Sequence, residues 1–291
     1  VLGLAGGAAA GTGMVLTPSG EVLTNNHVVE GATSVKVTDI GNGRTYGATV
    51  VGTDKTSDVA VLQLSGASGL TTVTLGNSSK VTKGQAVTAI GNAGGAGGTP
   101  SVTTGQVTAL DQSIVASDEI DQNQEHLNGL LQTDASLQPG DSGGPLVDNS
   151  AQVIAMNTAA SSNYQFQSGP SASYAIPIDE AATLADQMEA HEGSSTVHVG
   201  AAAIMGVTVQ GTAPTPGAPV KSVEPGSPAA GTGITPGDVI TSVGGQSVDS
   251  ASALSDLMEQ HHPGDRVQVS WLDPSGHQHT ATVTLVTGPA T

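Results

Sequence analysis

The feature that most constrains the fold of this chain is a long succession of short strand-like segments, which continues to about residue 176. Segments such as 13–17 (GMVLT), 34–40 (SVKVTDI), 58–64 (DVAVLQL) and 152–157 (QVIAMN) are rich in Val, Ile and Thr and are bounded by turn-forming residues. This composition and spacing are typical of β-strands. Many short strands without intervening helices predict a β-barrel or β-sandwich rather than alternating strands and helices.

A different pattern begins after these strands and divides the chain. Residues 178–189 carry apolar side chains at helical spacing, which predicts a helix. Strand-like segments then return around one helical stretch near residues 251–260. We therefore expect two domains, over residues 1–192 and 199–288, joined by a linker over residues 193–198.

The balance of charges limits the partners of this protein. Seven Lys and Arg residues oppose 25 Asp and Glu residues, which gives a formal net charge of −18 without any basic stripe along the sequence. A nucleic-acid-binding surface needs clustered basic residues, and an anionic membrane repels an acidic protein. Neither nucleic-acid binding nor attachment to an anionic membrane is expected.

No metal or cofactor site is expected either. The chain contains no Cys, which excludes disulfides and Cys-ligated metals. His277 and His279 could form a metal pair, but without a third ligand in view a hydrated hairpin explains them better. The acidic segment 117–125 lacks the spacing of an EF-hand. Residues 1–10 are too short to span a bilayer and lack a basic flank, so we expect no complete signal or anchor segment in the sequence as given.

The segment GDSGGP at residues 140–145 places Ser142 in a glycine-rich turn, as for a hydrolase nucleophile. A Ser hydroxyl needs a base to take its proton. Among the eight histidines, only His27 ends a buried-looking strand, and Asp58 directly precedes another. Asp54 is the rival carboxylate, but its neighbours are typical of a solvated turn. The chain order is therefore His, Asp, Ser, which is one of the orders known for Ser-His-Asp triads.

Several segments in this order carry a family resemblance. LTNNHVV (23–29), SDVAVLQL (57–64), AIGN (89–92) and GDSGGPLV (140–147) are similar to the trypsin-like serine proteases of the HtrA (DegP-like) group. With HHPGD at 261–265, the chain most resembles the secreted actinobacterial members of the PepA type. The resemblance implies a mainly β fold, a chymotrypsin-like double β-barrel followed by a PDZ-like α+β domain. It also implies a secreted or cell-envelope endopeptidase for unfolded or exported proteins, without a cofactor, and leaves homo-oligomerisation open.

The resemblance also implies roles for individual residues. Ser142 would attack the peptide carbonyl, His27 would transfer the proton, and Asp58 would orient the imidazole. The N–H groups of Gly140 and Ser142 would form the oxyanion hole. Asp141 departs from the Asn of most of the group. The segment that connects the N-terminus to the first strand-like segment is too short for the N-terminal ammonium to reach Asp141. We therefore expect the Asp141 carboxylate to bind other partners.

Substrate and peptide sites follow from the same resemblance. Ser136 would lie at the base of the specificity pocket, where an uncharged residue predicts no strong preference for Lys or Arg. Asn157, Thr158 and Ala159 would pair with the substrate backbone by strand addition. In the second domain, backbone N–H groups would bind a peptide carboxylate, from a loop formed by Ile204, Met205, Gly206 and Val207. A catalytically silent scaffold that only binds peptides is the alternative function.

Overall fold

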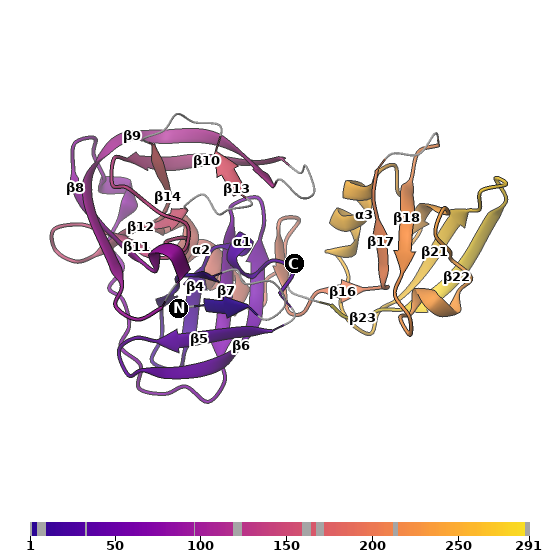
Figure 1. The fold of residues 1–291 in the computed structure, drawn as a ribbon, viewed down its shortest axis with the longest axis horizontal. Helices are drawn as coiled ribbons and strands as arrows, with labels where there is room; N and C mark the ends of the chain where they lie inside the picture. The colour runs from indigo at the N-terminus through magenta and orange to yellow at the C-terminus, as the bar shows by residue number, and fades with distance from the viewer. Residues whose placement is uncertain are drawn as a thin grey trace. The chain divides into compact units, whose positions relative to one another are not determined.

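The computed structural model describes residues 2–4, 10–32, 34–95, 97–118, 124–158, 164–166, 172–211 and 215–288. The chain divides into two compact units, of which the first ends at Val199 and the second begins at Gly200 (Figure 1). Among the described residues, no helix is long and apolar enough to cross a membrane. Strands dominate both units, as the sequence predicts.

The first β-barrel of unit one is built on an antiparallel sheet in the order β2-β1-β5-β6-β7-β4-β3, to which β15 adds by pairing with β6. Between β4 and β5 the chain forms one helical turn, α1 (Asn26–Val29). The bounds of the strands are β1 Leu2–Leu4, β2 Ala10–Gly11, β3 Met14–Val15, β4 Glu21–Thr24, β5 Val35–Asp39, β6 Arg44–Asp54, β7 Val59–Leu64 and β15 Val197–Val199.

The second β-barrel follows the order β10-β14-β12-β11-β8-β9-β13, and an additional pairing of β9 with β10 closes the ring. The long strands β9 and β10 form a hairpin that rises above the rest of the barrel in Figure 1. The bounds are β8 Ala86–Gly91, β9 Ser101–Asp118, β10 Gln124–Thr133, β11 Pro145–Val147, β12 Val153–Thr158, β13 Tyr164–Phe166 and β14 Ser173–Pro177.

Strand β7 explains how the two barrels share a core. Ala60 and Leu62 face the core of the first barrel, whereas Val59 and Val61 face a second cluster that includes residues of the other barrel. Because successive side chains of a strand point to opposite faces, a strand buried on both faces needs the continuous apolar run seen in this segment. The predicted helix 178–189 is confirmed as α2 (Ile178–Glu189), which packs Ile178 and other apolar residues into the shared cluster.

The segment expected as a linker is partly structured. Val197–Val199 forms β15, whose residues pair with Gly52–Asp54 of β6. Val197 is buried in the core that the barrels share. The backbone pairing and this buried side chain extend unit one beyond the expected boundary at residue 192, to Val199.

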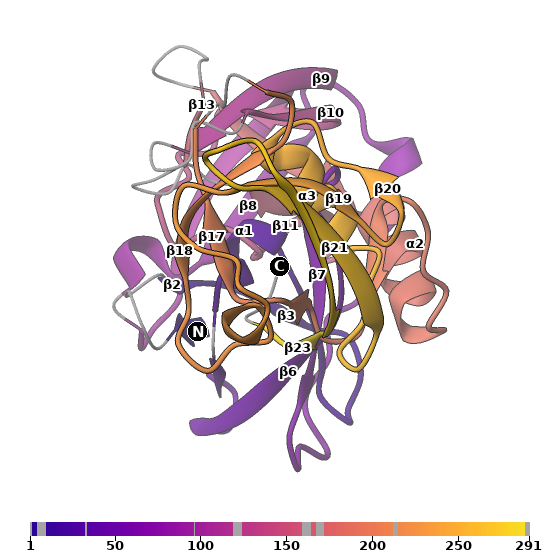
Figure 2. The same cartoon turned by 90° about the vertical axis from the view of Figure 1, so that its right-hand side faces the viewer.

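The second unit has a core of its own around Trp271 and Ile240. Its main sheet runs β17-β18-β19-β21-β22, with β17 at one edge, and α3 contacts β18 (Figure 2). Ser250 caps α3 by accepting a hydrogen bond from the Ala253 N–H at 3.1 Å. The bounds are β16 Ala203–Ile204, β17 Val207–Val209, β18 Ala218–Val223, β19 Val239–Val243, β20 Gln246–Ser247, α3 Ala251–Met258, β21 Arg266–Leu272, β22 Gln278–Thr284 and β23 Val286–Thr287.

Candidate active site

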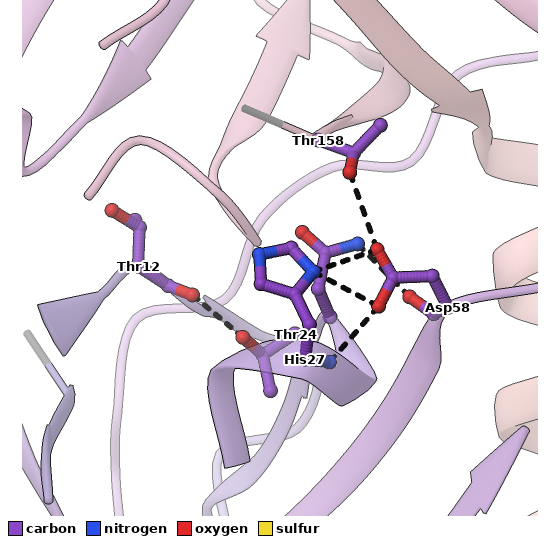
Figure 3. A network of polar contacts seen from close by, with 6 residues as sticks. Thr12, Thr24, His27, Asp58 and Thr158 are labelled. Carbon is purple, nitrogen blue, oxygen red and sulfur yellow. Dashed lines mark hydrogen bonds and ion pairs between the residues drawn. The ribbon is translucent and has the colours of Figure 1, made fainter. Parts of the chain in front are cut away.

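His27 lies on a single helical turn rather than at the end of a strand. Strand β4 ends at Thr24, Asn25 has an extended backbone, and α1 (Asn26–Val29) follows. The Glu30 N–H donates to the Asn26 carbonyl at 2.9 Å and closes the turn. The two successive Asn residues end the strand, because Asn favours turns and caps over regular secondary structure. The turn carries the His27 side chain out of the sheet and towards Asp58 (Figure 3).

Asp58 occupies the last position of the turn between β6 and β7, with a φ of 54°. Asp is one of the few residue types, apart from Gly, that tolerate this left-handed conformation. The side-chain amide of Asn25 donates to the Asp58 carbonyl at 2.9 Å, which ties this backbone to the segment before α1. Asp54, the rival carboxylate, accepts from the Thr56 hydroxyl and the Ser57 N–H and so closes its own turn.

The structure brings His27 and Asp58 into direct contact. Nδ1 of His27 lies 2.9 Å from Oδ2 and 3.0 Å from Oδ1 of Asp58, and the His27 backbone N–H donates to Oδ1 at 3.0 Å. The side chains are only 8% and 1% exposed. Because a carboxylate only accepts hydrogen bonds, we assign the neutral ring's proton to Nδ1. Nε2 is then the nitrogen that can accept a proton.

Thr158 completes the surroundings of the Asp58 carboxylate. Its hydroxyl donates to Oδ2 at 3.2 Å, and the dashed lines of Figure 3 show this contact beside those from the ring and the backbone N–H of His27. Thr158 belongs to β12 of the second barrel, so the bond crosses from one barrel to the other. A buried carboxylate with several hydrogen-bond donors avoids much of the cost of burying an unpaired charge.

Asn157, a second residue of the predicted substrate strand, lies beside the Ser142 turn. The Asn157 N–H donates to the Gly144 carbonyl at 2.8 Å, and its carbonyl accepts from the Gly143 N–H at 2.9 Å. Its backbone is therefore bonded within the barrel. Ala159 lies outside the described residues. Ser136 is exposed, and its hydroxyl accepts from the Gln138 side-chain amide at 3.4 Å.

Ser142 sits in a turn whose carbonyl groups are all held by hydrogen bonds. The carbonyls of residues 138–142 accept, in chain order, from the Asp141 N–H at 3.0 Å, the Gly94 N–H at 2.7 Å, the Thr12 hydroxyl at 2.8 Å, the Gly144 N–H at 3.0 Å and the Thr12 N–H at 2.8 Å. The C=O and N–H of a trans peptide point in opposite directions. The N–H groups of Gly140 and Ser142 therefore point away from the donors that hold the preceding carbonyls.

Glycine is required on both sides of this nucleophile. Gly140 and Gly143 have φ values of 99° and 80°, which side chains rarely adopt. A Cβ on Gly143 would overlap the Thr24 hydroxyl, which itself donates to the Thr12 carbonyl at 2.7 Å. Since Thr24 precedes α1 by only a short step, this packing brings the Ser142 turn up against the segment that carries His27.

Asp141 has found partners other than an N-terminal ammonium. It is 3% exposed, and its carboxylate accepts from the Ser101 hydroxyl at 2.7 Å and the Gln138 N–H at 2.9 Å. Both donors are neutral.

The predicted carboxylate-binding loop of unit two has a comparable arrangement. The Met205 carbonyl accepts from the Ala229 N–H at 2.8 Å, and the Gly206 carbonyl accepts from the Glu224 N–H at 2.9 Å. Gly206 has a φ of 80°. Ile204 ends β16 and Val207 begins β17, so the loop leads directly into the edge strand of the sheet.

Comparison with known proteins decides the family. Residues 11–156 match the trypsin-like peptidase domain, and residues 203–285 match the PDZ domain. The chain belongs to the HtrA-type, trypsin-like serine protease family. It is 39% identical to the serine protease PepD of Mycobacterium tuberculosis and 34% identical to the periplasmic pH-dependent serine endoprotease DegQ of Escherichia coli.

These alignments cover 94% and 90% of this chain but only 60% of PepD and 56% of DegQ. The chain thus spans somewhat more than half the length of these HtrA relatives. Among solved structures, it is similar to the HtrA-type protease AlgW with a decapeptide, with a TM-score of 0.53 and 28% identity, over 98% of this chain and 84% of that one.

Sequence reasoning missed three residues that hold the site together, namely Thr12, Asn25 and Thr158 as a partner of Asp58. Thr12 is flanked by two glycines, and Asn25 directly precedes the helical turn of His27. These local patterns indicate a bend and a cap, but they do not identify the distant groups that the side chains bind.

Proposed function

We propose that this chain is a serine endopeptidase in which Ser142 is the nucleophile, His27 the general base and Asp58 the residue that orients His27. The observation that carries the proposal is the buried contact of His27 Nδ1 with both carboxylate oxygens of Asp58. This contact holds the tautomer in which Nε2 can take the proton of a Ser hydroxyl. A hydroxyl without such a base is a weak nucleophile.

The reaction would follow the two-step course of Ser-His-Asp peptidases. Oγ of Ser142 attacks the peptide carbonyl carbon while Nε2 of His27 accepts its proton. The imidazolium, stabilised by Asp58, then gives that proton to the leaving amine. Water, deprotonated by His27 in turn, hydrolyses the acyl-enzyme and releases Ser142.

The oxyanion of each tetrahedral intermediate would be bound by the N–H groups of Gly140 and Ser142. Support comes from the five carbonyls of residues 138–142, each of which already accepts a hydrogen bond elsewhere. Because these carbonyls are held, none of them needs to turn for the two N–H groups to serve as donors. Preorganised donors of this kind contribute about 3–4 kcal/mol each to transition-state stabilisation.

Unit two would bind the C-terminus of a peptide. The carbonyls of Met205 and Gly206 each accept a hydrogen bond. In each of these peptides the N–H, that of Gly206 or Val207, points away from the donor that holds the carbonyl, as a carboxylate-binding loop requires. The peptide would then add as a strand to the edge strand β17. A fluorescent peptide with a free C-terminus should bind the chain, whereas the same peptide amidated at its C-terminus should not.

The proposed substrates are unfolded or exported proteins, cleaved outside the cytoplasm. The relatives named periplasmic support this location, and the uncharged Ser136 supports small to medium apolar residues before the scissile bond. Profiling of cleavage sites on a denatured protein mixture tests this preference, and cleavage mainly after Lys or Arg would contradict it. Light scattering tests whether the chain forms a homo-oligomer.

The decisive experiment is labelling with a fluorophosphonate probe, together with degradation of casein. The wild type should label and degrade, and Ser142→Ala should do neither. Ser150→Ala, which changes an exposed Ser in the turn after β11, is the matched control and should behave as the wild type. A folded wild type that binds peptides but neither labels nor cleaves would overturn the proposal in favour of a silent scaffold.

A further inference from the structure

The acidic residue before the nucleophile is held by a side chain from another part of the barrel. Asp141 is buried, and Oδ1 accepts from the Ser101 hydroxyl at 2.7 Å while Oδ2 accepts from the Gln138 N–H at 2.9 Å. Gly91, the last residue of β8, makes this close approach feasible, since a Cβ there would lie 2.7 Å from the Asp141 Cα. The carboxylate is thus fixed in place by a tight fit and by neutral donors.

Ser101 joins two loops that meet at the nucleophile. It is the first residue of β9, and its Oγ also accepts from the Ala93 N–H at 3.1 Å. The next residue, Gly94, donates its N–H to the Pro139 carbonyl at 2.7 Å. One hydroxyl therefore connects the loop around residues 93–95 to the turn of residues 138–142, beside the contact that holds Pro139.

The orientation of the Pro139–Gly140 peptide matters for the oxyanion hole. When the Pro139 carbonyl bonds to Gly94, the N–H of Gly140 points to the opposite side. Rotation of this peptide would replace the donor by a carbonyl oxygen and would repel a developing negative charge. Because Gly140 has no side chain to resist that rotation, the bond from Gly94 is what opposes it.

We propose that Ser101 is a positioning residue for the oxyanion hole, which it maintains by tying Asp141 to the loop whose Gly94 N–H holds the Pro139 carbonyl. This inference rests on the proposed peptidase activity. These contacts keep the turn of residues 138–142 in its competent arrangement through hydrogen bonds from uncharged donors within the second barrel.

The test is steady-state cleavage of a chromogenic peptide by Ser101→Ala. The oxyanion hole acts on the transition state, so kcat should fall about 10- to 100-fold while KM stays unchanged. Ser101→Thr keeps the hydroxyl and should retain most of the wild-type kcat. Ser113→Ala, an exposed Ser on the same strand, is the matched control and should be silent.

A double variant separates positioning from general damage to the fold. In Ser101→Ala, the buried carboxylate of Asp141 loses a donor, and adding Asp141→Asn removes this unpaired charge without restoring the link to the Ala93 N–H, so stability should recover while kcat stays low. If Ser101→Ala fails to fold, Ser101→Cys replaces it, because a thiol keeps the volume but donates weakly. A lowered kcat with unchanged KM is expected there too.

The outcomes distinguish this inference from the proposal on which it depends. An active wild type with an unaltered kcat in folded Ser101→Ala, or in Ser101→Cys, would overturn the role of Ser101 alone. A loss of kcat that Asp141→Asn relieves fully would also overturn it. A wild type without any cleavage would overturn both proposals.

Discussion

Two His–Asp pairs with nearly the same contact distance differ in almost every other respect. In unit one, Nδ1 of His27 lies 2.9 Å from Oδ2 of Asp58, and the side chains are 8% and 1% exposed. In unit two, Nε2 of His279 lies 3.0 Å from Oδ2 of Asp273, and the side chains are 47% and 26% exposed. Distance alone therefore does not distinguish the proposed catalytic pair from a structural one.

The surroundings of each carboxylate make the difference. The Asp58 carboxylate accepts hydrogen bonds from the Thr158 hydroxyl of the opposite barrel and from the backbone N–H of His27 in the helical turn. Asp273 instead accepts from the N–H groups of Ser275 and His277 and so closes the hairpin between β21 and β22. The buried pair is built from remote segments and fixes a tautomer, whereas the exposed pair stabilises a local turn.

The largest expected effect comes from neutralising the buried carboxylate of Asp58, with the exposed Asp273 as the comparison. Asp58→Asn should lower kcat about 10⁴-fold, because the imidazole then adopts the wrong tautomer. Asp273→Asn should leave the cleavage of a short peptide unchanged. Kinetics on the same chromogenic substrate measure both, and circular dichroism checks the fold. Equal effects of the two substitutions would show that the buried surroundings are irrelevant to catalysis.

A smaller effect tests the bond that crosses between the barrels. Thr158→Val keeps the side-chain shape but removes a donor from the buried Asp58, which costs about 1–3 kcal/mol for such groups. We expect kcat to fall roughly 5- to 100-fold without a comparable change in KM. Thr158→Ser retains the hydroxyl and serves as the control. If Thr158→Val equals the wild type in kcat, Thr158 does not position Asp58.

The exposed pair of Asp273 and His279 should affect how the stability of the fold depends on pH, rather than catalysis. The pKa of Asp273 is lowered well below its usual value of 3.8, chiefly by the hydrogen bond from His279 and then by the His277 N–H. A lowered pKa in the folded state stabilises the fold above pH 3.8, and this contribution is lost as the pH falls below that value. Thermal denaturation from pH 3 to 7 should therefore show a small advantage over Asp273→Asn that is constant near neutral pH and begins to shrink below pH 3.8.

The smallest effect concerns the carboxylate of Glu180, which belongs to neither His–Asp pair. Burial raises the pKa of Glu180, and the nearby Asp54 adds to this, although a hydrogen bond from Ser57 opposes it. With a raised folded pKa, the ionised form destabilises the fold at neutral pH, and this cost vanishes below about pH 4.5. Glu180→Gln should thus gain a few tenths of a kcal/mol near pH 7, given solvent screening. Urea denaturation at pH 7 and pH 4 provides the check, and an equal gain at both would contradict it.

Local patterns in the sequence predict much of this fold. The β-branched segments become strands, and the helical spacing of residues 178–189 becomes α2. The positions of His27 and Asp58 next to apolar segments identify the two residues that meet. These predictions succeed because strand and helix periodicities depend on neighbouring residues.

The contacts that hold the site together depend instead on distant residues. Thr158 and Asp58 are 100 positions apart, and Thr12 and Gly140 are 128 apart. No local periodicity specifies such partners, since closure of the barrels brings them together. The pairing of β15 with β6 is a similar case, because a three-residue strand gives little signal until the partner strand is in place.

The left-handed backbone of Asp58 restricts how this chain could evolve. With a φ of 54°, the position favours Asp, Asn or Gly irrespective of any chemistry. A duplicated copy released from selection for peptide cleavage would still be held by this conformational preference. Such descendants should therefore drift to Asn or Gly at position 58 more often than to Ala or Val. Asn keeps an acceptor oxygen for the buried donors around position 58, so this replacement would cost the fold least, and an evolutionary route from an enzyme to a scaffold would be open at this residue.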